Sequence, residues 1–339
     1  ANSRKVGTKT AKEDVAFLPE GRYHNTKTPR KGDAMEPITY QTYRNCTLCP
    51  RMCRVDRTRT PGFCGCRDQL TAARAALHQW EEPCISGTSG SGTVFFTGCT
   101  LRCCFCQNFS ISQEGFGREL SASQLARIFL SLQDKGAHNL NLVTPSHFLP
   151  HILDALSQAR PALTIPVVYN CGGYERPETI DALAGYVDIY LPDLKYFRSD
   201  YSREYSQAKD YFQKASQAIL RMIRQAGPPI LEPESGLMKK GVIIRHMVLP
   251  GAKEDSVKLL HWMKESLPPG GYLLSLLSQY TPFYHAESHP KINRRITSYE
   301  YRKVVDEAIR LGLTHGFMQE KSSAKEEYTP PFNLEGLDA

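Results

Sequence analysis

Three cysteines, Cys99, Cys103 and Cys106, have the residue type and the spacing that an iron–sulfur cluster requires. They are separated by three and by two residues and follow the apolar run 93–96, which predicts a buried strand. Three soft thiolate ligands on one loop can hold three irons of a cubane and leave the fourth iron open to another molecule. The spacing therefore predicts a cluster that takes part in chemistry. Packing as a small hydrophobic residue is the alternative, and it is our interpretation of Cys104.

A second group of cysteines precedes this motif. Cys46, Cys49, Cys53 and Cys64 are separated by two, three and ten residues, in a segment bent by prolines and glycines. A close pair of cysteines followed by a distant pair is typical of tetrahedral zinc sites. Four thiolates also suit a second iron–sulfur cluster, and the ligand types do not choose between these metals. A segment without bound metal is the third alternative.

Cysteine usage also indicates the compartment. The chain has 11 cysteines, an odd number, and nine of them lie between residues 46 and 104, several too close together to pair comfortably. No export signal is visible in the sequence, so we expect metal or redox chemistry in a reducing compartment and not a disulfide framework. No apolar run reaches the roughly 18 residues of a membrane span. We therefore expect a soluble, cytoplasmic protein with no membrane partner.

Strand and helix patterns alternate from residue 93 to about residue 320. Such alternation implies parallel strands joined by helical crossovers and hence an α/β fold. A doubly wound sheet and a partial barrel of the TIM type both fit, and both bind ligands at the carboxyl ends of the strands. The predicted strands are 93–96, 140–143, 165–169, 187–191, 242–248 and 272–277, and the predicted helices are 121–135, 147–159, 177–185, 200–226, 254–267 and 298–311.

The composition divides the chain into four parts. Residues 1–40 form a polar, basic arm that we expect to be flexible, 41–92 a cysteine-rich extension, 93–320 the barrel and 321–339 a tail. The net charge is +7, and residues 1–35 contribute +4 of it, with eight Lys or Arg against four Asp or Glu. Because the excess charge is concentrated in the arm, we expect no nucleic-acid partner. An arm that binds an anionic partner is the alternative.

The cysteine motif resembles the signature of the radical S-adenosylmethionine (SAM) superfamily, in which an aromatic residue, here Phe105, precedes the third cysteine. From about residue 43 to 320 the chain also resembles the pyruvate formate-lyase activating-enzyme-like branch, whose reactions are largely unassigned. The ferredoxin-like insert of some activating enzymes is absent, since Cys171 is the only cysteine after Cys106. The resemblance to the branch includes the stretches 77–87, 188–195 and 245–251.

This resemblance implies a partial (β/α)6 barrel with a [4Fe–4S] cluster at Cys99, Cys103 and Cys106. SAM would bind the open iron, and one electron from the reduced cluster would cleave SAM to methionine and a 5′-deoxyadenosyl radical. The radical would abstract hydrogen from a protein or a small molecule, and a flavodoxin- or ferredoxin-like donor would supply the electron. The other classes of function are a non-catalytic iron–sulfur or zinc scaffold and a radical SAM enzyme that modifies nucleic acids.

The resemblance also implies which residues hold SAM. Where many members carry Gly-Gly-Glu, this chain has 144–147, so Ser146, His147 or main-chain carbonyls would substitute. Ser146 could instead cap a helix. Arg245 and His246 alternate along a strand, so one of them should face the interior. The expected contacts with SAM are Phe105, Asn108, Ser146, His147, Asn170, Gly172, Asp193, Lys195 and Arg245.

Overall fold

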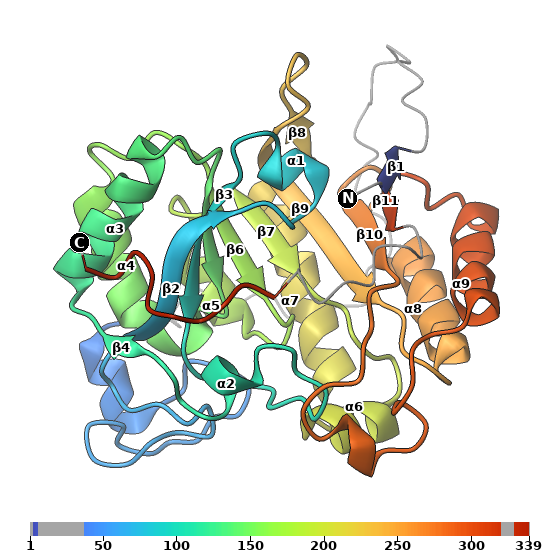
Figure 1. Cartoon of the computed structure of the whole chain (residues 1–339), viewed down its shortest axis with the longest axis horizontal. Coiled ribbons are helices and arrows are strands. Elements are labelled where there is room, and N and C mark those ends of the chain that lie inside the picture. Colours follow the sequence, from blue (N-terminus) through green and yellow to red (C-terminus); the bar gives the residue numbers. More distant parts are fainter. Residues whose placement is uncertain (1–2, 6–36, 320–328, 339) are drawn as a thin grey trace, which may run out of the picture.

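The computed structural model describes residues 3–5, 37–319 and 329–338. All six predicted strands are present and lie side by side in one sheet (Figure 1). Each pairs in parallel with the next, and β11 (Gly316–Gln319) adds a further parallel strand beyond the last of them. In sheet order the six are β3 (Ser91–Phe96), β5 (Leu140–Val143), β6 (Val167–Cys171), β7 (Ile189–Pro192), β9 (Met238–Met247) and β10 (Leu273–Leu277).

Helices follow these strands and pack against them, which confirms the predicted α/β class with a mostly parallel sheet. The first begins at the predicted capping box: Ser121 Oγ accepts from the Gln124 amide at 3.2 Å, and Gln124 Oε1 accepts from the Ser121 amide at 2.9 Å. The crossover helices are α3 (Ala122–Asp134), α4 (Leu149–Ala159), α5 (Pro177–Ala182), α7 (Tyr211–Ala226), α8 (Lys253–Ser266) and α9 (Ser298–Arg310).

The single helix predicted over 200–226 is wrong. The structure has α6 (Ser199–Ser206) and α7, separated where Gln207 adopts a left-handed backbone with φ 52°. The break is held from outside the segment, because the Arg51 guanidinium donates to the Ser206 carbonyl at 3.0 Å and to the Gln207 carbonyl. The break lies next to the cysteine motif, because the Ser206 hydroxyl, at the end of α6, is 3.0 Å from Cys103 Sγ.

A strand that the sequence analysis did not identify, β2 (Thr71–His78), lies inside the predicted cysteine-rich extension. It pairs antiparallel with β3, so the sheet includes part of that extension. Four of its eight residues are alanines, which carry little strand propensity and no alternation of polarity. The short strands β4 (Arg118–Glu119) and β8 (Ile230–Leu231) pair with β2 and β9.

The sheet is open, as expected of a partial barrel. Its edges are β4 and β1 (Ser3–Lys5), which pairs antiparallel with β11, and the two edges do not pair with each other in the described part of the chain. Apart from β1, most of the predicted basic arm, 6–36, lies outside the described residues, as do 320–328 of the predicted tail.

The carboxyl-terminal segment 329–338, which we call the strap, runs along β2 (Figure 1). The Leu334 amide donates to the Ala73 carbonyl at 3.0 Å, and the Ala75 amide donates to the Glu335 carbonyl at 2.8 Å. The remaining short helices are η1 (Tyr40–Asn45), α1 (Pro83–Ser86), α2 (Phe109–Ser112), η2 (Ser146–Phe148) and η3 (Ala286–Ser288). Among the residues described, no helix has both the length and the apolar character that a membrane crossing needs.

Candidate active site

A cavity of about 240 Å³ lies at the carboxyl ends of the parallel strands. Each of these strands ends beside it, and the cysteine loop, the segment after β2 and the strap complete its wall. The lining residues are His78, Trp80, Glu81, Phe95, Cys103, Phe105, Cys106, Gln107, Asn108, Val143, Asn170, Asp193, Lys195, Arg245, Met247, Leu249, Leu277, Gln279, Tyr280, Thr281, Thr329 and Pro330.

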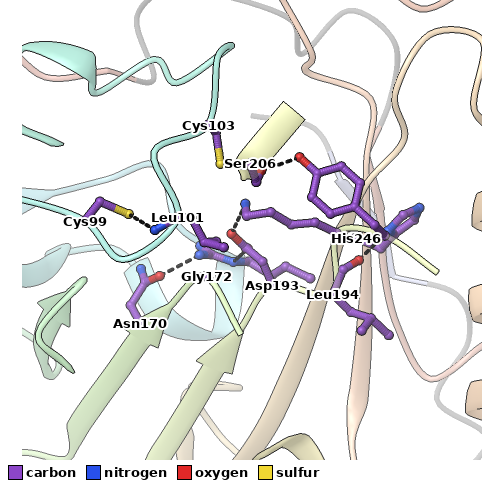
Figure 2. Close-up of polar contacts among 12 residues, drawn as sticks. Cys99, Leu101, Cys103, Asn170, Gly172, Asp193, Leu194, Ser206 and His246 are labelled. Atoms are coloured by element: carbon purple, nitrogen blue, oxygen red, sulfur yellow. Dashed lines mark hydrogen bonds and ion pairs between the residues drawn. The ribbon is translucent and has the colours of Figure 1, made fainter. Parts of the chain in front are cut away.

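The three cysteines of the main motif follow β3 on one tight loop. Gly98 starts the turn with φ 86°, and a Cβ at this position would overlap the Cys66 sulfur, so only glycine fits. Cys99 Sγ accepts from the Leu101 amide at 3.4 Å, and Cys106 Sγ lies 3.3 Å from Ser112 Oγ. Figure 2 shows Cys99 and Cys103 with their partners near the end of β6.

The thiols of this loop lie close enough to affect one another. Burial raises the pKa of the Cys99 thiol to about 11 and that of the Cys106 thiol to about 12, and the nearby Cys103 sulfur adds to both shifts. Iron binds the thiolate and displaces the proton, so these pKa values do not prevent ligation. The loop thus offers the three thiols of the motif, one buried and two half-buried, and its other cysteine, Cys104, lies outside their spacing. This fits a cubane with one open iron.

The floor of the cavity is formed by the segment that follows β2. Because β2 is antiparallel to β3, its last residue, His78, pairs with Ser91 at the start of β3, and the chain leaves β2 at the amino-terminal side of the sheet. From there Glu81 reaches into the barrel. Its Oε1 accepts from Asn141 Nδ2 at 2.9 Å and from Asn170 Nδ2 at 3.1 Å.

Arg245 connects this floor to the strand ends. Its Nη1 donates to Glu81 Oε2 at 3.1 Å, its Nε to Asp193 Oδ1 at 3.0 Å and its Nη2 to Asn170 Oδ1 at 2.5 Å. Lys195 Nζ donates to the other Asp193 oxygen at 2.6 Å. Two carboxylates thus face two cations, and the network carries no formal excess charge.

Asp193 and Lys195 stabilise each other's charged forms in spite of burial. Burial alone would raise the pKa of Asp193, but the charges of Lys195 and Arg245 hold it below its usual value. Burial likewise opposes the charge of Lys195, whereas Asp193 raises the pKa of that amine above its ordinary value. The cavity therefore presents fixed charges of both signs to a bound molecule.

Arg245, rather than His246, faces the cavity. His246 points to the opposite side of β9, where its Nδ1 lies 2.6 Å from the Leu194 carbonyl and its Nε2 lies 2.8 Å from Ser256 Oγ. Burial lowers the pKa of His246 to about 4, so its imidazole is neutral at pH 7. Its two hydrogen bonds hold β9 to the chain after β7 and to α8.

The structure brings six of the nine residues expected to contact SAM to the cavity. Three do not line it. Gly172 lies directly behind the cysteine loop, where a Cβ would come within 2.7 Å of Leu101 Cδ1. Ser146 and His147 lie in η2, where both side chains are buried. The six that line the cavity are Phe105, Asn108, Asn170, Asp193, Lys195 and Arg245.

Ser146 and His147 form contacts away from the cavity. Ser146 Oγ donates to Glu175 Oε1 at 2.5 Å and does not cap α4. His147 Nε2 donates to the Thr97 carbonyl at 2.6 Å. These two side chains connect η2 to the segments that follow β6 and β3.

Glu175 provides a pH test of this buried cluster. It is 2% exposed, and burial raises the pKa of its carboxyl from 4.5 to about 7. An acid whose folded pKa is raised stabilises the fold only while protonated, so this contribution is lost as the pH rises from 4.5 to 7. Glu175→Gln should therefore raise the free energy of unfolding at pH 8 by on the order of 3 kcal/mol and leave it nearly unchanged at pH 4.5.

Urea unfolding of both proteins at several pH values would measure this difference. Glu178→Gln, three residues further on in the first turn of α5 and with an exposed side chain, is the matched control and should follow the wild-type curve. Parallel pH dependences for wild type and Glu175→Gln would contradict the raised pKa.

Sequence reasoning missed several residues of the cavity, above all Glu81. Glu81 lies 164 positions from Arg245, and no spacing rule connects them. The only signal was the resemblance of the stretch 77–87, which includes His78, Trp80 and Glu81.

The second cysteine group lies behind the main motif. The Cys99 amide donates to the Cys64 carbonyl at 3.3 Å, and Cys66 Sγ donates to the Thr97 carbonyl at 3.3 Å. Within the described residues, no three side chains of His, Cys, Asp or Glu are close enough to hold a single metal ion.

This chain is similar to several known proteins. Residues 93–263 match the Radical SAM superfamily. The uncharacterized protein MJ0674 of Methanocaldococcus jannaschii is 30% identical over 296 residues, which are 84% of this chain and 80% of that protein. SuiB of Streptococcus suis bound to S-adenosylmethionine is similar at a TM-score of 0.45 and 14% identity, over 66% of this chain and 48% of SuiB.

Methylornithine synthase (PylB) is similar at a TM-score of 0.46 and 12% identity, over 73% of this chain and 65% of that enzyme. This chain thus spans about half the length of SuiB. The family match covers the sheet from β3 to β9 and includes the cysteine loop. The chain therefore belongs to the radical SAM superfamily, whose cofactors are a [4Fe–4S] cluster and SAM.

Proposed function

We propose that this protein is a radical SAM enzyme of the pyruvate formate-lyase activating-enzyme-like branch and that it abstracts hydrogen from a small polar molecule. One observation carries the assignment to the branch: all three stretches on which the resemblance rests contribute to one cavity. The first supplies Glu81, the second supplies Asp193 and Lys195, and the third supplies Arg245 and Met247. Residues far apart in the chain thus serve one site.

Within this proposal the residues divide by role. Cys99, Cys103 and Cys106 would hold the cluster, which together with SAM supplies a 5′-deoxyadenosyl radical. Lys195 is a suitable partner for the carboxylate of SAM, because an ammonium group forms a charge-assisted hydrogen bond there. Phe105 offers an aromatic face for adenine. The protein's own contribution is to hold the reacting carbon in place and to exclude water.

The wall of the cavity supports a small substrate. Thr329 and Pro330 of the strap close one side, and Glu81 with its partners closes the bottom. Glu81, Asp193, Lys195 and Arg245 all line the cavity, so its wall presents charged groups to a bound molecule. The balanced charges of the network suit a substrate with groups of both signs.

The reaction needs one electron for each SAM cleaved. We propose a flavodoxin- or ferredoxin-like protein as the donor, because the chain has no cysteine-rich insert after Cys106 to relay electrons. Activation of a protein remains the other reading of the branch resemblance, and the experiment below distinguishes it.

The test is formation of 5′-deoxyadenosine by the reconstituted protein without oxygen, with dithionite or flavodoxin as reductant. The dialysable fraction of a cell extract should stimulate product formation, and the retained macromolecules should not. Stimulation by the macromolecular fraction alone would favour protein activation. No 5′-deoxyadenosine under any of these conditions, with the cluster intact, would leave the non-catalytic scaffold as the better account.

A further inference from the structure

Backbone hydrogen bonds shape the segment that carries the second cysteine group. The chain doubles back after Cys49, so that the Arg54 amide donates to the Cys46 carbonyl at 2.9 Å. Met52 and Arg54, on either side of Cys53, adopt left-handed conformations with φ 45° and 56°, which are uncommon for residues other than glycine. The segment that carries Cys53 is thereby held against Cys46, since the Cys46 amide also donates to the Val55 carbonyl at 3.1 Å.

Cys64 lies beside Cys53 next to Gly62. A Cβ on Gly62 would lie 3.5 Å from Cys64 Sγ and 3.9 Å from Cys53 Sγ, so these sulfurs flank one glycine. Cys46, Cys49 and Cys64 are 5%, 7% and 7% exposed. Cys53 Sγ accepts from the Phe63 amide at 3.4 Å, the kind of hydrogen bond that tunes iron–sulfur clusters.

A buried cation at this group lacks an acidic partner. Arg57 is 0% exposed, and its guanidinium donates to the carbonyls of Cys66 (3.1 Å), His147 (2.5 Å) and Arg67 and lies 3.9 Å from Cys46 Sγ. No carboxylate forms an ion pair with it in the parts of the chain that the structure describes. A buried guanidinium is always charged and needs a nearby negative charge. Thiolates bound to a metal would supply that charge.

The spacing of the thiols distinguishes the possible metals. One zinc ion needs its ligands around a single point, and no three are so gathered within residues 37–319. The same is true of Cys99, Cys103 and Cys106, which belong to a superfamily motif for a cubane. In a cubane each cysteine binds a different iron, so its ligands stand farther apart than those of a single ion.

We propose that Cys46, Cys49, Cys53 and Cys64 hold a second iron–sulfur cluster, closed by four cysteines and lying behind the loop of the first. Arg57 is its counter-ion and positioning residue. The hydrogen bond from the Cys99 amide to the Cys64 carbonyl joins the two loops directly. Since four thiolates complete the coordination, this cluster has no open iron and does not bind SAM.

Iron and acid-labile sulfide analysis, with EPR of the reduced protein, tests the proposal on the full chain. Reconstituted wild type should contain about eight irons and eight sulfides. The variant C99A/C103A/C106A should keep about four irons and give an EPR signal that SAM does not alter. The variant C46S/C64S should keep about four irons and a signal that SAM does alter. Cys84→Ala, a buried cysteine away from both groups, should retain about eight irons.

An iron-free C99A/C103A/C106A protein would overturn the proposal, and so would about one zinc per chain in that variant. If C46S/C64S fails to fold, wild type and the triple variant still decide the question. These metal counts do not depend on SAM cleavage, so a failure here is separate from a failure of the proposed enzyme activity.

Discussion

Replacing Cys103 by alanine should abolish formation of 5′-deoxyadenosine and remove the EPR signal that responds to SAM. Three thiols are the fewest that hold the cubane with one open iron, and Cys103 is the middle ligand of the loop. The loss should be complete to the background of the assay, because the neighbouring thiol, Cys104, lies outside the three-thiol spacing of the motif. Ser206 Oγ lies 3.0 Å from Cys103 Sγ, but a hydroxyl is a harder and poorer ligand for such clusters.

Cys104→Ala is the matched control, since it changes the neighbouring cysteine and leaves the three-thiol spacing intact. The Cys104 backbone amide and carbonyl pair with the Tyr205 carbonyl and the His285 amide, contacts that an alanine keeps. This variant should retain the cluster and at least half of the wild-type rate. Activity that survives in Cys103→Ala, or is lost in Cys104→Ala, would mean that the ligands have been assigned wrongly.

The positions of the strands along the chain and the place of the cluster loop could be predicted from sequence because both depend on local patterns. A short apolar run bounded by turn residues indicates a buried strand, and the spacing of Cys99, Cys103 and Cys106 lies within eight residues. The rule that ligands bind at the carboxyl ends of parallel strands then placed Asp193 and Lys195 at the cavity.

The rest of the site depends on contacts between distant parts of the chain. β2 is stabilised by pairing with β3 and with the strap. Its alanine-rich sequence has no alternation of apolar and polar residues that would predict a strand. Glu81 enters the barrel only because β2 is antiparallel. The end of α6 also depends on a distant residue. The Arg51 guanidinium donates to the Gln207 carbonyl, 156 positions away in the sequence.

The largest expected effect on stability is at Arg245. Arg245→Met should lower the free energy of unfolding by about 3–5 kcal/mol, because it leaves the buried Glu81 carboxylate without its charged partner. Asp193 keeps Lys195 and should contribute less to the loss. The variant should still bind iron at its cysteines, and its substrate-stimulated formation of 5′-deoxyadenosine should fall to background. Urea unfolding and iron analysis of the same preparation measure the two effects separately.

The double variant E81Q/R245M separates the effect of the ion pair on stability from its effect on activity. Removing both charges takes away the unpaired carboxylate, so most of the lost stability should return. The floor would then have no guanidinium for a substrate, and the stimulated activity should stay at background. If the double variant were no more stable than Arg245→Met, the loss would reflect packing of the arginine side chain and not an uncompensated charge. If its activity returned with its stability, Arg245 would act only as a structural residue.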